Sequence, residues 1–401
     1  MSCPIFVWGN TETMPRGATK HSQVAIIGAG VIGLSTAYHL ALHGFSPITV
    51  FEREGIGSGA SGIAPGGVRR QWATAVNCAM SGESLQFYRR IDEILEPDAP
   101  LVFRECGYLF LAHSEPALEG LRANVALQSE FRIPSRIIAP QEIGAIVPAL
   151  KSETVTGASY CPEDGYFDDP WGVIFAFARA AQRRGVRIEN STVLGLHRER
   201  NAWQLQLADG TAAAEQVVIA AGSDSVQLLK PQGLELPIRA EPRYLFYSNV
   251  LSERICDPLV ISDEREFAVK QMSNGQFLTS YLGAGRHGRE QTPEAWKARI
   301  SEVADELLPA LLDVSLTHMV KGYYDMTPDS QPIVAAIPDR ENLWVAAGLS
   351  GHGFMMAPAV GRAIADLIRG VNPAWYFQGL GLERFSGEAQ SGRLTVERQV
   401  I

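Results

Sequence analysis

The segment between residues 24 and 52 constrains the fold more than any other part of the chain. An apolar run, Val24–Ile27, leads into a turn with glycines at positions 28, 30 and 33, then a helical stretch to about His43. A second apolar run from residue 48 ends at Glu52. In the G-x-G-x-x-G pattern the glycines allow a tight turn, close approach of a pyrophosphate and close helix packing. The segment therefore predicts a strand–turn–helix–strand unit that binds a dinucleotide.

The expected nucleotide contacts lie on the turn and at the end of the second strand. The helix N-terminus attracts phosphate, and an acid about 20 residues beyond the turn holds ribose hydroxyls. The predicted contacts are Gly28, Ala29, Gly30, Val31, Ile32, Gly33, Glu52 and Arg53. The alternative is an apolar membrane span or core segment, which the three glycines, Ser35 and His39 disfavour.

A second loop of small residues follows and favours a flavin over a nicotinamide nucleotide. A flavin dinucleotide needs further small residues and backbone N–H groups along its ribityl chain and pyrophosphate. The predicted contacts in this loop are Ser58, Ala60, Ser61, Gly62, Gly66, Gly67 and Val68. The alternative is a flexible surface linker. An NAD-dependent dehydrogenase would use the first loop without needing the second.

With both loops in place, the chain resembles the FAD-dependent amine and amino-acid oxidoreductases typified by D-amino-acid oxidase, glycine oxidase and sarcosine oxidase. It is most similar to the beta subunits of proline dehydrogenases and heteromeric sarcosine oxidases. A distant second match supports this, in residues 322–329 and 343–354. The resemblance implies that the later loop and the helix after it face the flavin, although the loop alone would also fit an ordinary strand-to-helix turn. These contacts are Gly322, Gly348, Ser350, Gly351, His352, Gly353, Phe354 and Met355.

Between the two matches, residues 165–188 resemble the middle portion of the family. Val193 falls where relatives touch the adenine through the backbone, and Ala221 and Gly222 end a strand that closes the cofactor site. The implied fold is α/β (α+β), with a Rossmann-type FAD-binding domain interleaved with an antiparallel-sheet substrate domain. We expect the FAD-binding domain in residues 21–80, 151–231 and 319–371, and the substrate domain in 81–150 and 232–318. Residues 1–20 and 372–401 are expected to be terminal extensions.

Composition excludes several other classes of protein. A net charge of -9 over 401 residues argues against a nucleic-acid surface, which needs clustered Lys and Arg. Five widely spaced cysteines without a C-x-x-C pattern indicate neither a zinc site nor a disulfide framework. We therefore expect no metal and a reducing, cytoplasmic location. The first 21 residues lack a signal-peptide pattern.

The chemistry of amine oxidation suggests the catalytic candidates. The carbon beside the nitrogen must lie over the flavin, and an amino-acid carboxylate needs a cation, for which arginine is suited. Arg69 is the preferred candidate near the flavin and Arg70 the second, although either residue could instead form a structural ion pair. His352 could bond flavin or substrate, or only shape its turn. Tyr281 is a further candidate, as are Tyr244 and Tyr324, which aromatic packing would equally explain.

Three departures from the monomeric sarcosine oxidases refine the expectation. The position of their flavin-linked cysteine is Gly322 here, which implies noncovalent FAD. Met355 replaces a lysine that helps bind the substrate carboxylate. Thr279 matches the lysine that activates oxygen, which favours a dehydrogenase, unless nearby Lys270 supplies that charge.

The implied function is FAD-dependent oxidation of the C–N bond of a secondary-amine or N-alkyl amino acid, proline-like or sarcosine-like, to an imine by hydride transfer. A primary (D-)amino acid is an alternative substrate. A second alternative is a flavin-binding subunit or assembly factor with a mainly structural role. The expected partners are a small amine substrate, oxygen or another redox carrier, and further subunits of a hetero-oligomer, with no nucleic acid and no transmembrane segment.

Overall fold

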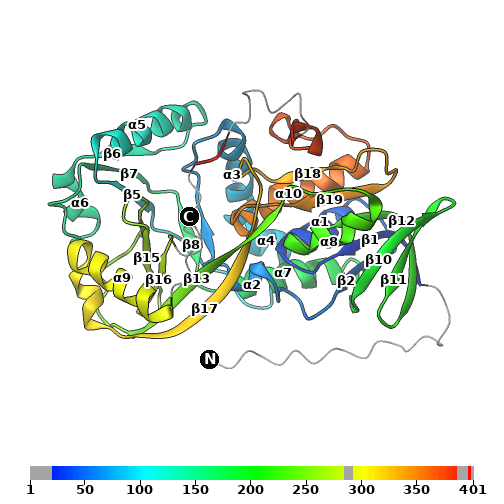
Figure 1. Cartoon of the computed structure of the whole chain (residues 1–401), viewed down its shortest axis with the longest axis horizontal. Coiled ribbons are helices and arrows are strands. Elements are labelled where there is room, and N and C mark those ends of the chain that lie inside the picture. The colour runs from blue at the N-terminus through cyan, green and yellow to red at the C-terminus, as the bar shows by residue number, and fades with distance from the viewer. Residues whose placement is uncertain (1–19, 284–291, 386–395, 399–401) are drawn as a thin grey trace.

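Two large sheets form the body of the protein in this computed structural model, which describes residues 20–283, 292–385 and 396–398. Figure 1 shows the sheets side by side along the long axis, with two long strands, β13 and β17, running between them. The chain crosses repeatedly from one sheet to the other. The expected combination of a Rossmann-type unit with a largely antiparallel sheet is confirmed.

The first sheet has parallel strands at its centre and antiparallel strands at its sides. Its main path runs β10-β11-β12-β1-β2-β9, and β19 with β18 joins beside β12. The pairs β12–β1, β1–β2, β2–β9 and β12–β19 are parallel. The strands are β1 (Lys20–Ile27), β2 (Ile48–Glu52), β9 (Arg187–Asn190), β10 (Val193–Glu199), β11 (Ala202–Leu207), β12 (Gly210–Ile219), β18 (Ile333–Ala336) and β19 (Leu343–Ala347).

The second sheet has eight strands in the order β17-β13-β16-β15-β14-β5-β7-β6, antiparallel except between β14 and β5. Its strands are β5 (Tyr108–Ala112), β6 (Arg136–Ile138), β7 (Gly157–Cys161), β13 (Arg239–Val250), β14 (Leu259–Ser262), β15 (Phe267–Gln271), β16 (Gln276–Tyr281) and β17 (Leu316–Met326). A small third sheet joins β3 (Gly67–Val68), β8 (Gly165–Phe167) and β4 (Phe103–Glu105).

Two strands lie otherwise than the expected division of the chain. We expected residues 151–231 and 319–371 in the FAD-binding domain. β7 falls within the first range and residues 319–326 of β17 fall within the second, yet both strands belong to the second sheet. Both pair with neighbours distant in sequence, β5 with β7 and β13 with β17. Local composition does not reveal such partners, so the domain boundaries themselves remain a prediction.

The helices cover the sheets and pack into the core. They are α1 (Val31–Leu42), α2 (Ala60–Ile63), α3 (Ala75–Tyr88), α4 (Ile91–Leu95), α5 (Glu115–Glu130), α6 (Pro140–Ile146), α7 (Pro170–Gln182), α8 (Ser225–Leu229), α9 (Pro293–Leu307) and α10 (Gly353–Ile368). Short 3-10 turns occur at Gly222–Asp224, Lys230–Gln232, Pro309–Asp313, Trp375–Phe377 and Leu382–Phe385. The helix that follows the later loop begins at Gly353, and α7 begins at Pro170, because proline is favoured at the first position of a helix.

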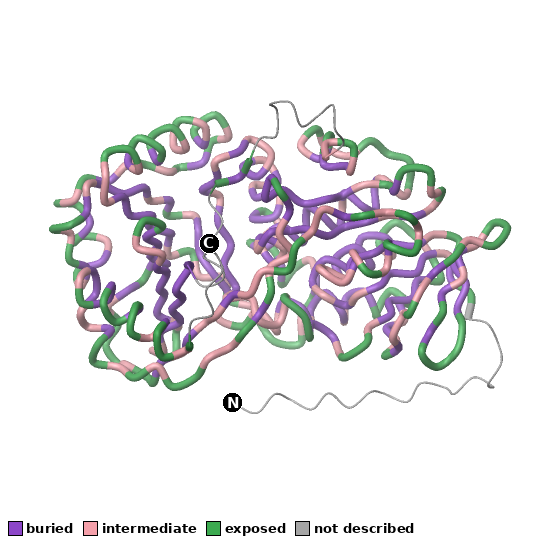
Figure 2. The backbone as a smooth tube through the Cα atoms, viewed as in Figure 1, coloured by how far each residue is buried: buried purple, intermediate pink, exposed green. Residues whose placement is uncertain are grey.

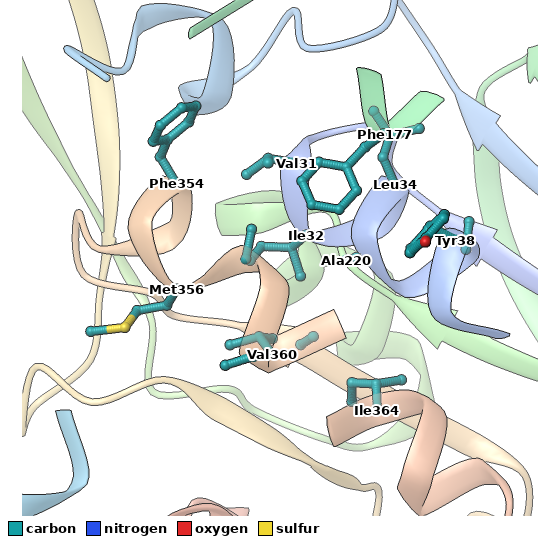
Figure 3. Close-up of a cluster of buried hydrophobic side chains, with 14 of the residues drawn as sticks. Val31, Ile32, Leu34, Tyr38, Phe177, Ala220, Phe354, Met356, Val360 and Ile364 are labelled. Atoms are coloured by element: carbon teal, nitrogen blue, oxygen red, sulfur yellow. The ribbon is translucent and has the colours of Figure 1, made fainter. Parts of the chain in front are cut away.

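A large part of the core lies where α1 meets α10. Ten of the twelve residues of α1 are buried, as expected for a helix that is apolar on all sides. Ser35 donates to the Ala357 carbonyl over 2.8 Å, and an ideal Cβ on Gly361 would collide with Ser35, so the helices approach closely. Figure 3 shows side chains from α1, α7 and α10 interlocked there, and Figure 2 shows the buried backbone running through both sheets.

The apolar stretch that follows residue 24 is thus a core strand, turn and helix. Among the described residues, no helix combines the length and apolar character needed to cross a membrane.

Candidate functional site

The first glycine loop joins β1 to α1 at the edge where three parallel strands end. Ile27 pairs with both Phe51 and Ile219, so the ends of β1, β2 and β12 meet. Gly28 has a φ of 109°, and an ideal Cβ there would lie 3.2 Å from the Ala221 Cα. The turn therefore lies directly against the end of β12, which places Ala221 and Gly222 beside the first loop as the resemblance implied.

Backbone contacts between helix and strand explain the third glycine. An ideal Cβ on Gly33 would lie less than 3.0 Å from the Gly28 carbonyl oxygen, a distance that real Cβ atoms do not show. Gly30 is the N-cap of α1 and supplies no side chain. The first turn of the helix therefore presents backbone N–H groups, which is the arrangement that binds a pyrophosphate.

The second glycine loop folds onto the first. The Gly57 N–H donates to the Ala29 carbonyl over 2.9 Å, and the Ser61 hydroxyl accepts from the Val31 N–H over 3.0 Å. Two loops that are separate in sequence therefore form one surface of small residues. This juxtaposition fits a dinucleotide with a long linker and does not fit the alternative of a free surface loop.

Polar groups at the end of β2 form the other end of this cradle. The Glu52 carboxylate accepts from the Ala29 N–H over 2.9 Å and from the Glu54 N–H over 3.0 Å. Arg53 is ion-paired with Asp224 at 2.9 Å. Val193 begins β10 shortly after Ser191, whose N–H donates to the Glu52 carbonyl over 2.9 Å. These predicted adenosine contacts lie together, and their roles remain a prediction.

The distant motif at residues 348–354 is held by its partner motif at 322–329. Asp325 accepts from the Gly348 N–H over 2.7 Å, and its own carbonyl accepts from the Ser350 N–H over 3.2 Å. The Ser350 hydroxyl accepts from the Thr327 N–H over 3.2 Å. Burial raises the pKa of Asp325, an effect that its hydrogen bonds to the loop backbone oppose. The two matching segments therefore form one braced loop before α10.

A pocket lies between the second glycine loop, the loop at residues 348–354 and the second sheet. We call it the central pocket. From the loops it is lined by Ala64, Pro65, Gly66, Gly67, Arg69, Gly351, His352, Phe354 and Met355. From the strands it is lined by Tyr108, Arg243, Leu245, Leu259, Ala268, Val269, Lys270, Leu278, Thr279, Ser280, Leu282 and Tyr324. The N-terminus of α10 borders this space, so the positive end of the helix faces it.

Three cations and no acidic side chain line the central pocket in the described part of the chain. Arg69 is 1% exposed, and its guanidinium lies 3.5 Å from the centre of the Trp72 ring. Arg243 donates to the Pro242 carbonyl over 3.0 Å and stacks at 4.8 Å on Tyr324. Glu241 lies 3.3 Å from Arg243 and offsets part of its charge. The remaining positive charge of the pocket wall favours an anionic ligand.

Lys270 is the third cation and is buried in the pocket wall. Its ammonium donates to the Pro65 carbonyl over 2.7 Å and lies 3.9 Å from the Tyr166 ring centre. Burial lowers its pKa from 10.5 to about 8. Thr279, on the neighbouring strand, donates instead to the Ala268 carbonyl over 2.9 Å. Lys270 therefore places a cation in the pocket wall, which is the possibility left open where Thr279 alone favoured a dehydrogenase.

The lowered pKa of Lys270 predicts a pH-dependent stability. Between pH 8 and 10.5 the unfolded chain keeps a proton on this lysine that the folded protein has lost, so stability rises with pH in this window. Below it the buried charge destabilises the fold by about 3 kcal/mol, at 1.36 kcal/mol per unit. We expect the wild-type free energy of unfolding to rise more steeply from pH 8 to 10 than that of Lys270→Met, measured by urea denaturation. Parallel slopes in the two proteins would contradict this.

His352 is a neutral imidazole inside the pocket wall. It is 4% exposed, and within the described chain neither ring nitrogen has a hydrogen-bond partner. Its ring meets Trp72 edge to face at 4.4 Å. Burial, with the nearby charge of Arg69 as a second cause, lowers its pKa well below 6.5. Buried polar groups without a partner are rare in proteins, so both ring nitrogens are available to a polar ligand in the pocket.

The other candidates have separate surroundings. Arg70 is ion-paired with Glu163 at 2.7 Å and does not line the central pocket. Tyr281 donates to Glu266 over 2.7 Å in the core of the second sheet, and Tyr244 packs on Trp296 at 4.0 Å. Neither tyrosine lines the pocket, whereas Tyr324 does. The structure thus gives Arg70 and Tyr281 structural partners in place of the catalytic positions we expected.

Gly322 lies on β17 beside the second loop. An ideal Cβ there would be 3.1 Å from the Ile63 side chain, and Gly322 pairs with Arg243 in the sheet. The described cysteines, Cys78, Cys106, Cys161 and Cys256, are all free thiols, and Cys3 lies outside the described residues. None lines the central pocket, and no described group of His, Cys, Asp and Glu could hold a metal ion.

Two glycine loops that fold onto each other, and a helix N-terminus that borders an electropositive pocket beside the second of them, define a flavin-dependent oxidoreductase. The chain belongs to the FAD-dependent oxidoreductase family, whose model matches residues 23–367. FAD is the cofactor of this family.

Similar proteins agree with this assignment. The chain is 28% identical over 396 residues to FAD-dependent oxidoreductase domain-containing protein 1 from Xenopus laevis, covering 87% of this chain and 79% of that protein. It is 27% identical to the sarcosine oxidase subunit beta from an Arthrobacter species, covering 95% and 94%. The crystal structure of L-proline dehydrogenase from P. horikoshii superposes with a TM-score of 0.84 at 28% identity, covering 92% and 98%.

Proposed function

We propose that this protein oxidises the C–N bond of a secondary-amine or N-alkyl amino acid, of proline or sarcosine type, to an imine with noncovalently bound FAD. The observation that carries the proposal is the central pocket. Three cations and a neutral histidine line this space between the second glycine loop, the loop at residues 348–354 and the second sheet. The names of its relatives, a sarcosine oxidase subunit and a proline dehydrogenase, point to the same substrate class.

The residues of the pocket suit each requirement of such a substrate. Bound FAD supplies the acceptor for a hydride equivalent. Arg69 offers a planar fork that matches a carboxylate, and Arg243 and Lys270 add positive charge. The same charges disfavour an ammonium group, so they lower the pKa of the bound amine and favour its reactive neutral form. As the hydride leaves carbon, the nitrogen lone pair forms the C=N bond.

The side chains around these cations keep water out of the site. Leu245, Leu278 and Phe354 line the pocket, and Phe354 is 6% exposed. Exclusion of water strengthens the attraction between the cations and a carboxylate. The neutral state of His352 leaves it free to donate or accept a hydrogen bond without adding a fourth charge.

The test is an anaerobic titration of the purified yellow protein. We expect L-proline, D-proline, sarcosine or another N-alkyl amino acid to bleach the flavin absorbance band. The methyl ester of the active compound is the control, because it lacks the carboxylate charge and should react at least tenfold more weakly. If dithionite bleaches the flavin but no amine does, the proposal is wrong and a mainly structural role is favoured.

The electron acceptor follows from a second step of the same experiment. The reduced enzyme is mixed with oxygen or with an artificial quinone, and the return of the flavin band is timed. Since Lys270 places an ammonium in the pocket wall, the proposed enzyme could be an oxidase or a dehydrogenase. Faster reoxidation by oxygen would identify an oxidase, and faster reoxidation by the quinone would identify a dehydrogenase. One relative is a sarcosine oxidase subunit beta, so we also propose that this protein works with further subunits.

A further inference from the structure

A carboxylate from the C-terminal tail lies buried behind the central pocket. Glu397 is 1% exposed, although its neighbour Val396 is 42% exposed. Residues 372–401 were expected to form a terminal extension, in which an acidic side chain would be exposed. Glu397 is buried instead, and it does not line the central pocket. A buried carboxylate is costly unless several donors satisfy it.

Glu397 is satisfied by the segment that directly follows Arg69. Its carboxylate accepts from the Ala73 N–H over 3.1 Å, from the Thr74 hydroxyl over 2.9 Å and from the Asn77 amide over 3.1 Å. The tail is held from its other side as well, because the Glu397 N–H donates to the Asp329 carbonyl over 3.0 Å. Asp329 is in turn ion-paired with Arg384 at 2.8 Å.

These bonds do more than cap a helix. Thr74 is already the N-cap of α3, where its hydroxyl accepts from the Asn77 N–H over 3.4 Å. The Ala73 N–H, which Glu397 also binds, precedes the helix. The carboxylate therefore restrains the connection between α3 and the pocket.

This connection is short and internally bonded. The Trp72 indole donates to the Arg69 carbonyl over 3.1 Å, and the Arg69 guanidinium lies on the Trp72 ring and donates to the Gln71 carbonyl. Trp72 also forms the edge-to-face contact with His352. Hydrogen bonds and ring contacts therefore connect the segment at residues 73–74, through Trp72, to both Arg69 and His352. Burial lowers the pKa of Arg69, and the negative charge of Glu397 is the largest influence that opposes this effect.

We propose that Glu397 is a positioning residue that holds Arg69 ready for a substrate carboxylate, so that the segment of residues 396–398 completes the active site. This inference rests on the proposed function, since it assumes an anionic ligand in the central pocket. Glu397 does not itself line the central pocket, so its role in substrate affinity is indirect.

The test measures the affinity of the holoenzyme for benzoate, an unreactive carboxylate, from the change in the flavin spectrum. We expect Glu397→Gln to weaken benzoate binding at least tenfold while FAD remains bound, because the amide places an N–H group among buried donors. Glu397→Asp keeps the charge and should bind within about threefold of wild type. The matched control Asn77→Ala removes one donor from the same carboxylate and should also remain within about threefold.

Several outcomes would overturn the inference. If Glu397→Gln lowers the melting temperature but binds benzoate as wild type does, or more tightly, Glu397 is only a structural cap or a distant charge. If wild-type holoenzyme binds no carboxylate, the proposed function itself fails.

A second measurement needs no variant, because coupling between two sites is reciprocal. Benzoate should slow amide hydrogen exchange at residues 72–78 and 396–398 of the wild-type holoenzyme. Unchanged exchange at both segments, with benzoate bound, would contradict the proposal even if Glu397→Gln did not fold.

Discussion

Replacement of Arg69 by methionine is expected to lower kcat/KM for the amino-acid substrate by at least about 100-fold. Arg69 is the buried cation between the second glycine loop and His352, and methionine retains much of its apolar contact with Trp72. A hydrogen bond to a charged group contributes about 1.5–3 kcal/mol, and a carboxylate on the guanidinium fork loses two of them. Since 1.4 kcal/mol is a tenfold change, steady-state kinetics with the substrate found by titration will resolve the loss.

The neighbouring arginine provides the matched control. Arg70 has its own ion pair with Glu163 and does not line the central pocket, so Arg70→Met should change kcat/KM by less than about threefold. Arg69→Lys keeps the charge but not the fork, and we expect it to recover only part of the activity. Equal losses in Arg69→Met and Arg70→Met would show that the pair acts on stability rather than on the substrate.

Replacement of Gly33 by alanine is expected to abolish stoichiometric FAD binding. The added methyl group would lie against the Gly28 carbonyl oxygen, and both groups are backbone-fixed, so the turn and α1 must separate. Overpacking of this kind costs about 1–3 kcal/mol and here displaces the N–H groups that bind the pyrophosphate. The ratio of flavin to protein absorbance after purification, together with the melting temperature, measures both effects.

Gly144→Ala is the control for this substitution. Gly144 is exposed on α6, outside both glycine loops, and nothing within 4 Å would meet its added Cβ. We expect this variant to purify yellow with a melting temperature at least as high as that of wild type. A fully loaded Gly33→Ala protein would mean that the close packing of turn and helix is not required for the cofactor.

The cofactor-binding half of the fold was predictable because its signals are local. The glycine spacing, the apolar runs on either side and the acid at residue 52 all lie within one short segment, and the structure places β1, α1 and β2 there. The strand predicted from Val24 begins four residues earlier, at Lys20, because β12 continues to pair with it. Farther along the chain, β10, β11 and β12 pair in sequence order, and β12 is also the partner of β1.

The substrate side of the pocket was harder to predict because strand pairing brings it together. Arg243 enters the central pocket from β13 and Lys270 from β15, and neither has a distinctive neighbourhood in sequence. A lysine after the apolar run Phe267–Val269 was the one available signal for Lys270. Tyr281 illustrates the opposite error, since an aromatic residue on a predicted pocket strand turned its hydroxyl to Glu266 instead.

The order of the segments also decides when the site can exist during synthesis. The first glycine loop leaves the ribosome early, whereas the N-terminus of α10, which lines the central pocket, follows roughly 300 residues later. At about 5–20 residues per second, synthesis of the chain between the first loop and α10 takes on the order of 15–60 s. A nascent chain in this interval exposes the apolar face of α1 that α10 will cover. Cofactor capture is therefore a late event of folding, and a chain that ends before α10 carries the first loop without a flavin site.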